Sequence, residues 1–162
     1  MERVSAIESH MPAGVSRVLI PQYVEQLVYR PPASVKDLDR FVGIPYDEAT
    51  LDCADFVLRV QKEFFLRDVS LPSSRPRGVA GQAAIGELSR PFAQRTETPQ
   101  DGDLVLMIEH GQKRPGHVGV YFWVAHEAWV LHSNERNGCS VMHRVRDLPD
   151  FGLRIEGTYS WV

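Results

Sequence analysis

Residues 50–60 read TLDCADFVLRV and place Cys53, one of the two cysteines of the chain, at the start of an apolar run with helical spacing. Asp52 is a preferred residue for the position just before a helix. Asp55 stands three residues later, where a carboxylate can bond back to the start of the helix. The pattern predicts a helix that begins at Cys53 and packs one apolar face against the rest of the protein.

A cysteine at the start of a helix has two interpretations. Most such cysteines are small apolar residues that fill space in the core. The first turn of a helix also presents unpaired amides and the positive end of the helix dipole, which lower the pKa of a thiol and favour the nucleophilic thiolate. The carboxylates of Asp52 and Asp55 oppose that effect in part. A reactive cysteine in this position would need a base from elsewhere in the chain.

Two histidines in the second half of the chain are candidates for that base and its partner. His117 opens the stretch HVGVYFWV, residues 117–124, where strand alternation places His117, Gly119 and Tyr121 on one face and the small glycine leaves room beside the imidazole. His132 lies in the next apolar stretch and could hydrogen-bond to the far nitrogen of His117, as the third group of a catalytic triad does. Taken singly, His117 is better explained as a solvent-exposed strand end and His132 as a hydrogen-bonded core histidine.

Composition places the chain among ordinary globular proteins and narrows its partners. It has 162 residues, 43% of them hydrophobic, with 18 basic and 21 acidic side chains and a formal net charge of -3. That length suits one domain with its own core, and the lack of a clustered basic run argues against nucleic-acid binding. No apolar run is long enough for a membrane span, and residues 1–20 lack the apolar centre of a signal peptide. We therefore expect a protein that is cytoplasmic when synthesised. Two cysteines without a CxxC pair predict neither a disulfide framework nor a zinc site.

The spacing of apolar residues changes near the middle of the chain from helical to strand-like, which predicts an α+β fold. Ser34 and Asp37 form a second capping pair, for a helix that Gly43 ends, and Asn137-Gly138 is typical of a tight hairpin turn. The strands should form a small antiparallel sheet of about five strands with the helices packed on it. The expected helices cover residues 22–30, 34–42, 53 onward and 79–88, with a loop at 67–78, and the expected strands cover residues 103–108, 117–124, 129–133, 139–145 and 154–161.

The register of the two histidine-bearing strands leaves one alternative open. A two-residue turn at His126-Glu127 would place His132 opposite Tyr121, too far along the strand from His117. Either a wider loop or a bulge corrects this register, or the residue that orients His117 is Asn134 instead.

Four blocks of the sequence, in their order, resemble the NlpC-type papain-like cysteine peptidases. The resemblance spans about residues 38–162, so it predicts a peptidase domain over residues 34–162 and an N-terminal extension over residues 1–33. The version found in phage tails is the most similar in the first block and in IEGTYSW at residues 155–161. The blocks are GIPY at residues 43–46 followed by Asp52-Cys53, GDLVL at 102–106, HVGVY at 117–121 and VLHS at 130–133.

The resemblance implies a circularly permuted papain-like fold and cleavage of amide bonds in the stem peptides of peptidoglycan. Cys53 is then the nucleophile, His117 the general base and later acid, and His132 the orienting residue. Tyr46 corresponds to a tyrosine that stabilises the oxyanion together with the Cys53 amide, although it is nearly as well explained as a packing residue beside a turn. No metal or organic cofactor is implied.

The sequence departs from the family in two places near the nucleophile. Ala54-Asp55 stands where the family has Ser-Gly or a similar small pair, and we interpret Asp55 as a cap rather than as a group that binds a substrate amine. The interval between Tyr46 and Cys53 lacks the family's glycine-rich insertion, so the wall of the cleft should differ there.

The lack of a wall-binding module and an export signal suggests delivery by a larger machine. A phage or prophage tail, or a secretion system, would carry the protein to the periplasm or cell wall, and the protein would then be associated with the virion or with the secretion machine. Two alternatives keep the same fold. One is an acyltransferase or lipid hydrolase that uses the same Cys-His pair, and the other is a non-catalytic tail assembly module.

Overall fold

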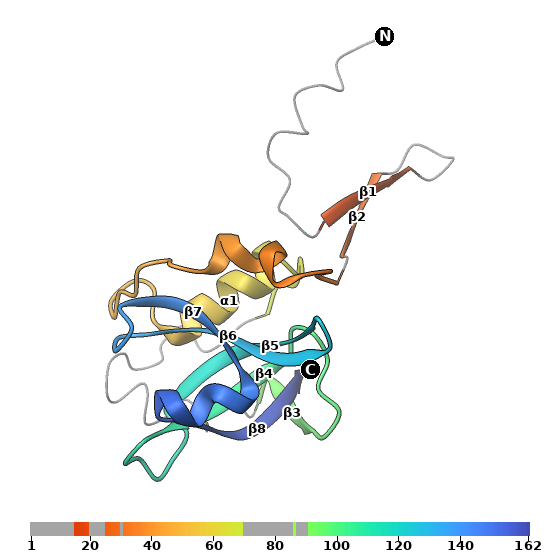
Figure 1. Ribbon diagram of the computed structural model, residues 1–162. Helices are drawn as coiled ribbons and strands as arrows, with labels where there is room; N and C mark the ends of the chain where they lie inside the picture. Colours follow the sequence, from red (N-terminus) through yellow and green to blue (C-terminus); the bar gives the residue numbers. More distant parts are fainter. Residues whose placement is uncertain (1–14, 20–24, 30, 70–85, 87–90) are drawn as a thin grey trace.

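The computed structural model of the chain describes residues 15–19, 25–29, 31–69, 86 and 91–162 (Figure 1). Within these residues the fold is α+β, as predicted, with α1 and two short 3-10 helices, η2 and η3. The strands are β1 (Val15–Leu19), β2 (Glu25–Tyr29), β3 (Ala93–Thr96), β4 (Leu104–Glu109), β5 (His117–Val124), β6 (Glu127–Asn134), β7 (Cys139–Arg144) and β8 (Leu153–Trp161). The helices are η2 (Val35–Phe41), α1 (Cys53–Glu63) and η3 (Val145–Phe151).

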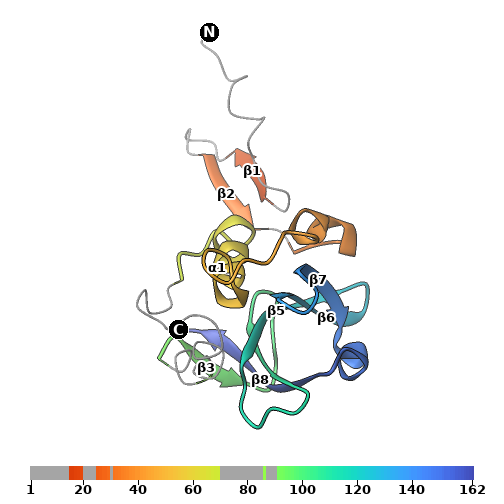
Figure 2. The same cartoon turned by 90° about the vertical axis from the view of Figure 1, so that its left-hand side faces the viewer.

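The main sheet has six antiparallel strands in the order β3-β8-β4-β5-β6-β7. Five of them are the strands expected from the sequence, and β3 is a sixth that the sequence analysis missed. The N-terminal strands β1 and β2 form a separate antiparallel pair, which lies apart from the main sheet in both views (Figures 1 and 2).

The prediction of a helix over residues 22–30 is wrong, because Glu25–Tyr29 forms β2 and pairs with β1. The physical reason is visible in the sequence, since this stretch is rich in valine and tyrosine, which favour strands, and too short for its periodicity to decide. The helix expected over residues 79–88 and most of the loop at 67–78 lie outside the described residues, apart from the helical Gly86.

The start of α1 is fixed by the predicted capping box. The Asp52 carboxylate accepts hydrogen bonds from the amides of Ala54 at 3.0 Å and Asp55 at 2.9 Å. In return, the Asp55 carboxylate accepts the amide of Asp52 at 3.3 Å. Asp55 is therefore a capping residue, as predicted. No helix among the described residues combines the length and apolar character needed to cross a membrane.

The second predicted cap is also present, although its helix is 3-10 rather than α. The Asp37 carboxylate accepts hydrogen bonds from the amides of Ala33 and Ser34, each at 2.8 Å. The helix ends at Phe41, and Gly43 follows with a positive φ of 81°. Leu38 and Phe41 are buried, so η2 contributes to the core beside α1.

The central strands are buried on both faces. On one face, the apolar side of α1 packs against β5 and β6, with Phe64 just beyond α1 lying 5.7 Å from Phe122 between ring centroids. On the other face, Tyr121 and Val130 pack with Leu148 of η3. The sheet is therefore a layer between α1 and η3, and alternation along β5 sends even-numbered side chains toward α1 and odd-numbered ones toward η3.

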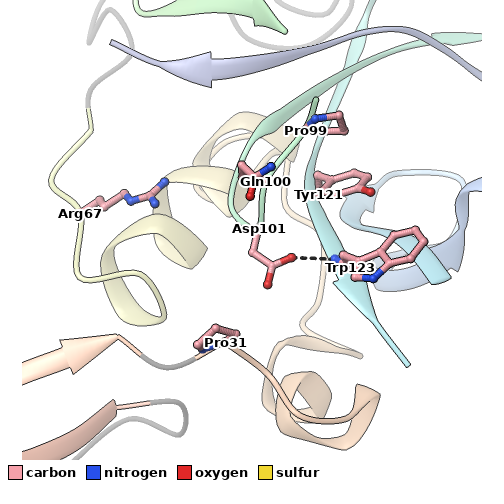
Figure 3. A pocket seen from close by; sticks show the side chains of 7 residues that line it. All are labelled: Pro31, Arg67, Pro99, Gln100, Asp101, Tyr121 and Trp123. Carbon is pink, nitrogen blue, oxygen red and sulfur yellow. Dashed lines mark hydrogen bonds between the residues drawn. The ribbon is translucent and has the colours of Figure 1, made fainter. Parts of the chain in front are cut away.

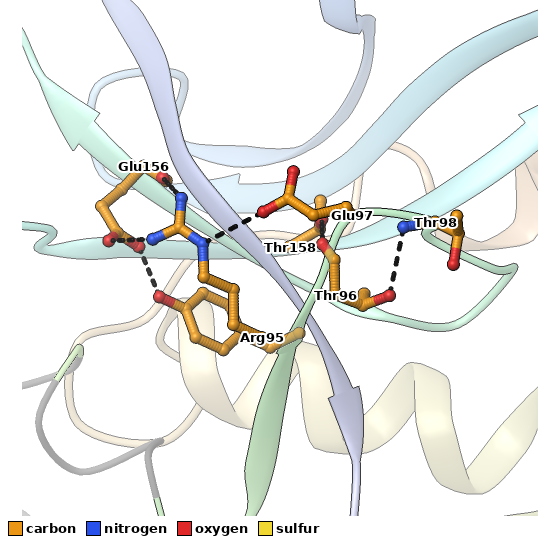
Figure 4. A network of polar contacts seen from close by, with 7 residues as sticks. Arg95, Thr96, Glu97, Thr98, Glu156 and Thr158 are labelled. Atoms are coloured by element: carbon orange, nitrogen blue, oxygen red, sulfur yellow. Dashed lines mark hydrogen bonds and ion pairs between the residues drawn. The ribbon is translucent and has the colours of Figure 1, made fainter.

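The missed strand β3 pairs with β8, and polar side chains form a network across the pair (Figure 4). The Arg95 guanidinium lies 3.3 Å from the Glu156 carboxylate and 3.7 Å from that of Glu97. The Tyr159 hydroxyl donates to Glu156 at 2.8 Å, and the Thr158 hydroxyl donates to the Thr96 carbonyl at 2.8 Å. Exposed ion pairs of this kind contribute little stability, so β3 is held mainly by its backbone ladder.

Candidate active site

Cys53 is the first residue of α1 and only 4% exposed. The helix that it begins packs against β5 and β6, the strands that carry the two candidate histidines. The amides of Ala54 and Asp55, next to the thiol, bond to the Asp52 carboxylate. The cap therefore fixes the position of the cysteine backbone, while its negative charge offsets part of the positive end of the helix.

His117 and His132 form a buried hydrogen-bonded pair. His117 Nε2 lies 2.8 Å from His132 Nδ1, and the rings meet edge to face. The two side chains are 2% and 0% exposed, so the interpretation of His117 as a solvent-exposed strand end is wrong. Since Nε2 of His117 is engaged with His132, Nδ1 is the nitrogen that remains to meet a substrate or a thiol.

Burial keeps both imidazoles neutral. Burial lowers the pKa of His117 from 6.5 to about 4. Burial also lowers the pKa of His132 well below its ordinary value, and the neighbouring His117 and His143 add to that shift by charge repulsion. At neutral pH, His117 is therefore an unprotonated imidazole, which is the form required of a general base.

The register of β5 and β6 explains how the two rings meet. Ala125 and His126 form a two-residue turn with φ of 54° and 62°, and Val124 pairs with Glu127. This turn lies one residue earlier than the His126-Glu127 turn considered from the sequence, and the difference moves His132 from opposite Tyr121 to opposite Gly119. No wider loop or bulge is needed, because His132 now lies diagonally across from His117.

The alternative orienting residue, Asn134, has a different partner. Its side-chain oxygen accepts the amide of Asn137 at 2.9 Å inside the loop that joins β6 and β7. Asn134 pairs with Cys139, so the loop covers residues 135–138 and is longer than the predicted two-residue turn. The contact with His117 is made by His132.

Gly119 leaves the space that the sequence predicted. A Cβ built on this residue would lie 2.5 Å from Cγ1 of Val130 and 3.1 Å from Cβ of His132. Real Cβ atoms do not approach as closely as the first distance, and the second is tight, so any larger residue would push β5 and β6 apart at the histidine pair.

Tyr46 belongs to a segment that runs along the outer edge of β7. Its amide donates to the Gly138 carbonyl at 3.0 Å, and the preceding Pro45 bridges to Cys139. The half-buried side chain lines a shallow hollow with Glu48 and Glu135, among other residues. The role of Tyr46 in oxyanion stabilisation stays a prediction.

The strand alternation determines which face the histidines occupy. His117 follows the odd-numbered residues of β5 toward η3, whereas Val118 and Phe122 belong to the cluster beneath α1. The ladder between β5 and β6 begins only at the pair Gly119 and His132, so the first residues of β5 pair with β4 alone. Cys53 belongs to the cluster beneath α1, so the thiol lies on the face of the sheet opposite to the one that the His117 ring follows.

A third histidine, which the sequence analysis missed, extends the pair. His143 of β7 places Nδ1 3.1 Å from Nε2 of His132, and its ring stacks on Phe151 with 3.8 Å between centroids. Burial lowers the pKa of His143, against an opposing effect of Asp147. The signal was present in the sequence, because a hairpin at Asn137-Gly138 brings the strand of His143 beside that of His132.

The three imidazoles bond to one another in a line instead of converging on one point. Within the described part of the chain, no group of three or more histidine, cysteine or acidic side chains is placed to hold a metal ion. Cys139, the second cysteine, is half-buried at the start of β7.

A second hollow lies farther along β5, where Tyr121 and Trp123 face Arg67, Gln100 and Asp101, beside two prolines (Figure 3). The Trp123 side chain is 55% exposed, while its backbone amide donates to the Asp101 carboxylate at 2.6 Å. Burial, with the nearby charges of Asp101 and Asp103, raises the pKa of Tyr121. The sequence did not indicate this hollow.

Comparisons of the chain with protein-family models, with curated proteins and with solved structures found no match.

Proposed function

We propose that this protein is a cysteine amidase or endopeptidase with a circularly permuted papain-like fold. The observation that carries the proposal is the buried hydrogen bond between His117 and His132, on strands packed beneath the helix that begins with Cys53. A nucleophile at a helix start, a neutral base and a third group that orients the base are the three parts of such a triad.

In the proposed reaction, Nδ1 of His117 takes the thiol proton of Cys53 as Sγ attacks the carbonyl carbon of an amide. The tetrahedral oxyanion is stabilised by the amide of Cys53 and the hydroxyl of Tyr46. The C–N bond then breaks, His117 returns the proton to the leaving amine, and a thioester remains. Water, deprotonated by His117, hydrolyses the thioester. Because the pKa of His117 is about 4, the proton moves during the attack rather than resting on the imidazole beforehand.

The proposal requires Sγ of Cys53 and Nδ1 of His117 to meet at the start of β5. The C-terminal end of α1 lies at Phe122, near the far end of that strand. A helix of this length begins about 16 Å away, which is long enough to reach the level at which the ladder between β5 and β6 begins. The site is nearly closed to solvent, so substrate entry also requires a local opening.

The substrate class that we propose is the stem peptide of bacterial peptidoglycan, and the carrier is a phage or prophage tail or a secretion system. What supports this choice is the resemblance of the four sequence blocks to NlpC-type peptidases.

Digestion of purified muropeptides, followed by mass spectrometry, tests the proposal. The wild-type protein should shorten tri- and tetrapeptide stems, and Cys53→Ala and His117→Ala should leave them intact. Cys139→Ala is the matched control, because it removes the other thiol and should keep full activity. Intact stems with the wild-type protein would contradict the substrate class.

The second candidate is a non-catalytic docking module, and the burial of Cys53 and His117 favours it. The rate at which iodoacetamide alkylates Cys53 separates the two functions without any substrate. An active triad predicts a rate that falls at least about tenfold in His117→Ala. A packing cysteine predicts slow alkylation in the wild type and a rate that does not fall in this variant.

A further inference from the structure

His143 of β7 continues the histidine pair beyond His132. The three rings lie on neighbouring strands and join through single contacts, at 2.8 Å between His117 and His132 and at 3.1 Å between His132 and His143. The stack on Phe151, with ring planes 10° apart, holds the His143 ring so that Nδ1 faces His132. Each contact joins two nitrogens, and one hydrogen lies between each pair.

Two arrangements of these hydrogens fit the same heavy atoms. In the first, His143 accepts at Nδ1, so His132 carries its hydrogen on Nε2 and accepts at Nδ1, and His117 carries its hydrogen on Nε2. Nδ1 of His117 is then a free base. In the second arrangement every hydrogen is reversed, and Nδ1 of His117 carries the hydrogen and cannot take one from a thiol. The tautomer of the outermost ring therefore decides whether the innermost ring is a base.

We propose that His143 is a positioning residue that holds His132, and through it His117, in the tautomers that the reaction needs. The catalytic purpose of this role rests on the proposed function, whereas the effect of His143 on the tautomers does not depend on whether the protein cleaves peptidoglycan. His143 contacts His132 and Phe151, and it acts in this proposal only through His132. Its contribution is a hydrogen-bond acceptor, Nδ1, at a fixed position, because β7 and the stack on Phe151 hold the ring in place.

Two variants separate this role from simple packing. His143→Phe keeps a ring to stack on Phe151 but removes the acceptor. His143→Asn loses the ring but places an amide oxygen where it can accept from Nε2 of His132. A packing role predicts that Phe is the better replacement, and a tautomer-setting role predicts that Asn is.

Long-range nitrogen-15 NMR spectra of the imidazoles read the tautomers directly at neutral pH. We expect hydrogens on Nε2 of His117 and His132 in the wild type and in His143→Asn, and a shift toward hydrogen on Nδ1 in His143→Phe. The alkylation rate of Cys53 should fall at least about tenfold in His143→Phe and recover in His143→Asn, since a base in the wrong tautomer loses most of its activity.

Unchanged tautomers in His143→Phe would overturn the inference, whatever happens to activity. A tautomer shift in this variant, in a protein that leaves muropeptides intact, would support the inference while contradicting the proposed function. The two failures are therefore distinguishable. Circular dichroism of each variant, compared with the wild type, confirms that the spectra are read on folded protein.

Discussion

Asp52 is the residue that fixes where α1 begins and hence where the Cys53 thiol lies. Its carboxylate accepts two backbone amides, whereas the reciprocal bond from Asp55 is longer, at 3.3 Å. We predict that Asp52→Ala lowers the free energy of unfolding by about 1 kcal/mol, as is typical for the loss of an N-cap. Asp55→Ala should lower it less. Urea denaturation of both variants measures this order, and an equal or reversed loss would contradict it.

His117 should make the stability of the protein depend on pH. Its pKa is about 4 in the folded protein, below the 6.5 of an unperturbed histidine, so between these values only the unfolded chain binds the proton. The contribution of His117 to the free energy of unfolding is therefore complete above about pH 6.5. It falls by about 3 kcal/mol as the pH drops to about 4. His117→Gln removes this titration. Denaturant unfolding across the pH range should give a shallower slope for the variant, and parallel slopes would show that His117 titrates normally.

At the scale of elements, the turn between β5 and β6 sets the register of the two histidines. Its two residues are of types that disfavour the backbone conformation of this turn. Ala125 and His126 both have positive φ, which costs residues with a Cβ about 1 kcal/mol each. We predict that Ala125→Asn with His126→Gly raises the free energy of unfolding by about 1 kcal/mol, because Asn-Gly suits this turn. The melting temperature should rise. Gly138→Ala, at a φ of 69°, is the opposite control and should lower it.

A substitution at Gly119 tests whether β5 and β6 need to approach each other closely. Its missing side chain makes room for Val130 and for His132 on β6. We predict that Gly119→Ala separates the strands locally, lowers the free energy of unfolding by about 1–3 kcal/mol and weakens the contact between His117 and His132. Chemical shifts of the two imidazoles report that contact. Unchanged shifts in the folded variant would mean that the sheet absorbs the methyl group elsewhere.

The elements that the sequence predicted well are those with a strong local signal. The start of α1 and five sheet strands follow from caps, apolar runs and turn residues. Strand β3 has the polar sequence AQRT, and its pairing with β8 is long-range, so neither pattern nor propensity indicates it. The prediction of the candidate site shows the same difference between local signals and long-range pairing. His117 and His132 were predicted together, but the register that joins them comes from a two-residue turn at Ala125-His126 instead of the wider loop or bulge considered from the sequence. The contribution of His143 depends on the pairing of a further strand.

At the scale of the whole molecule, Ser140 makes several of the hydrogen bonds that join the edge of the sheet to the segment leading to Cys53. The Ser140 hydroxyl donates to the Phe41 carbonyl at 2.6 Å and accepts the Ile44 amide at 2.8 Å. The Ser140 backbone also pairs with Gly43 and Ile44. These bonds cover the open edge of β7 and join η2 to the main sheet.

Ser133, directly opposite on β6, is the matched control. Both serines are fully buried, but the Ser133 hydroxyl has no hydrogen-bond partner among the described residues. We predict that Ser140→Ala lowers the free energy of unfolding by about 1–3 kcal/mol, because it leaves a buried carbonyl and amide unpaired. Ser133→Ala removes an unpaired polar group and should be neutral or stabilising. Denaturant unfolding measures both. Because Ser140 holds the chain that leads into α1, its loss should also expose Cys53 to faster alkylation, and equal behaviour of the two variants would mean that this edge does not position the cysteine.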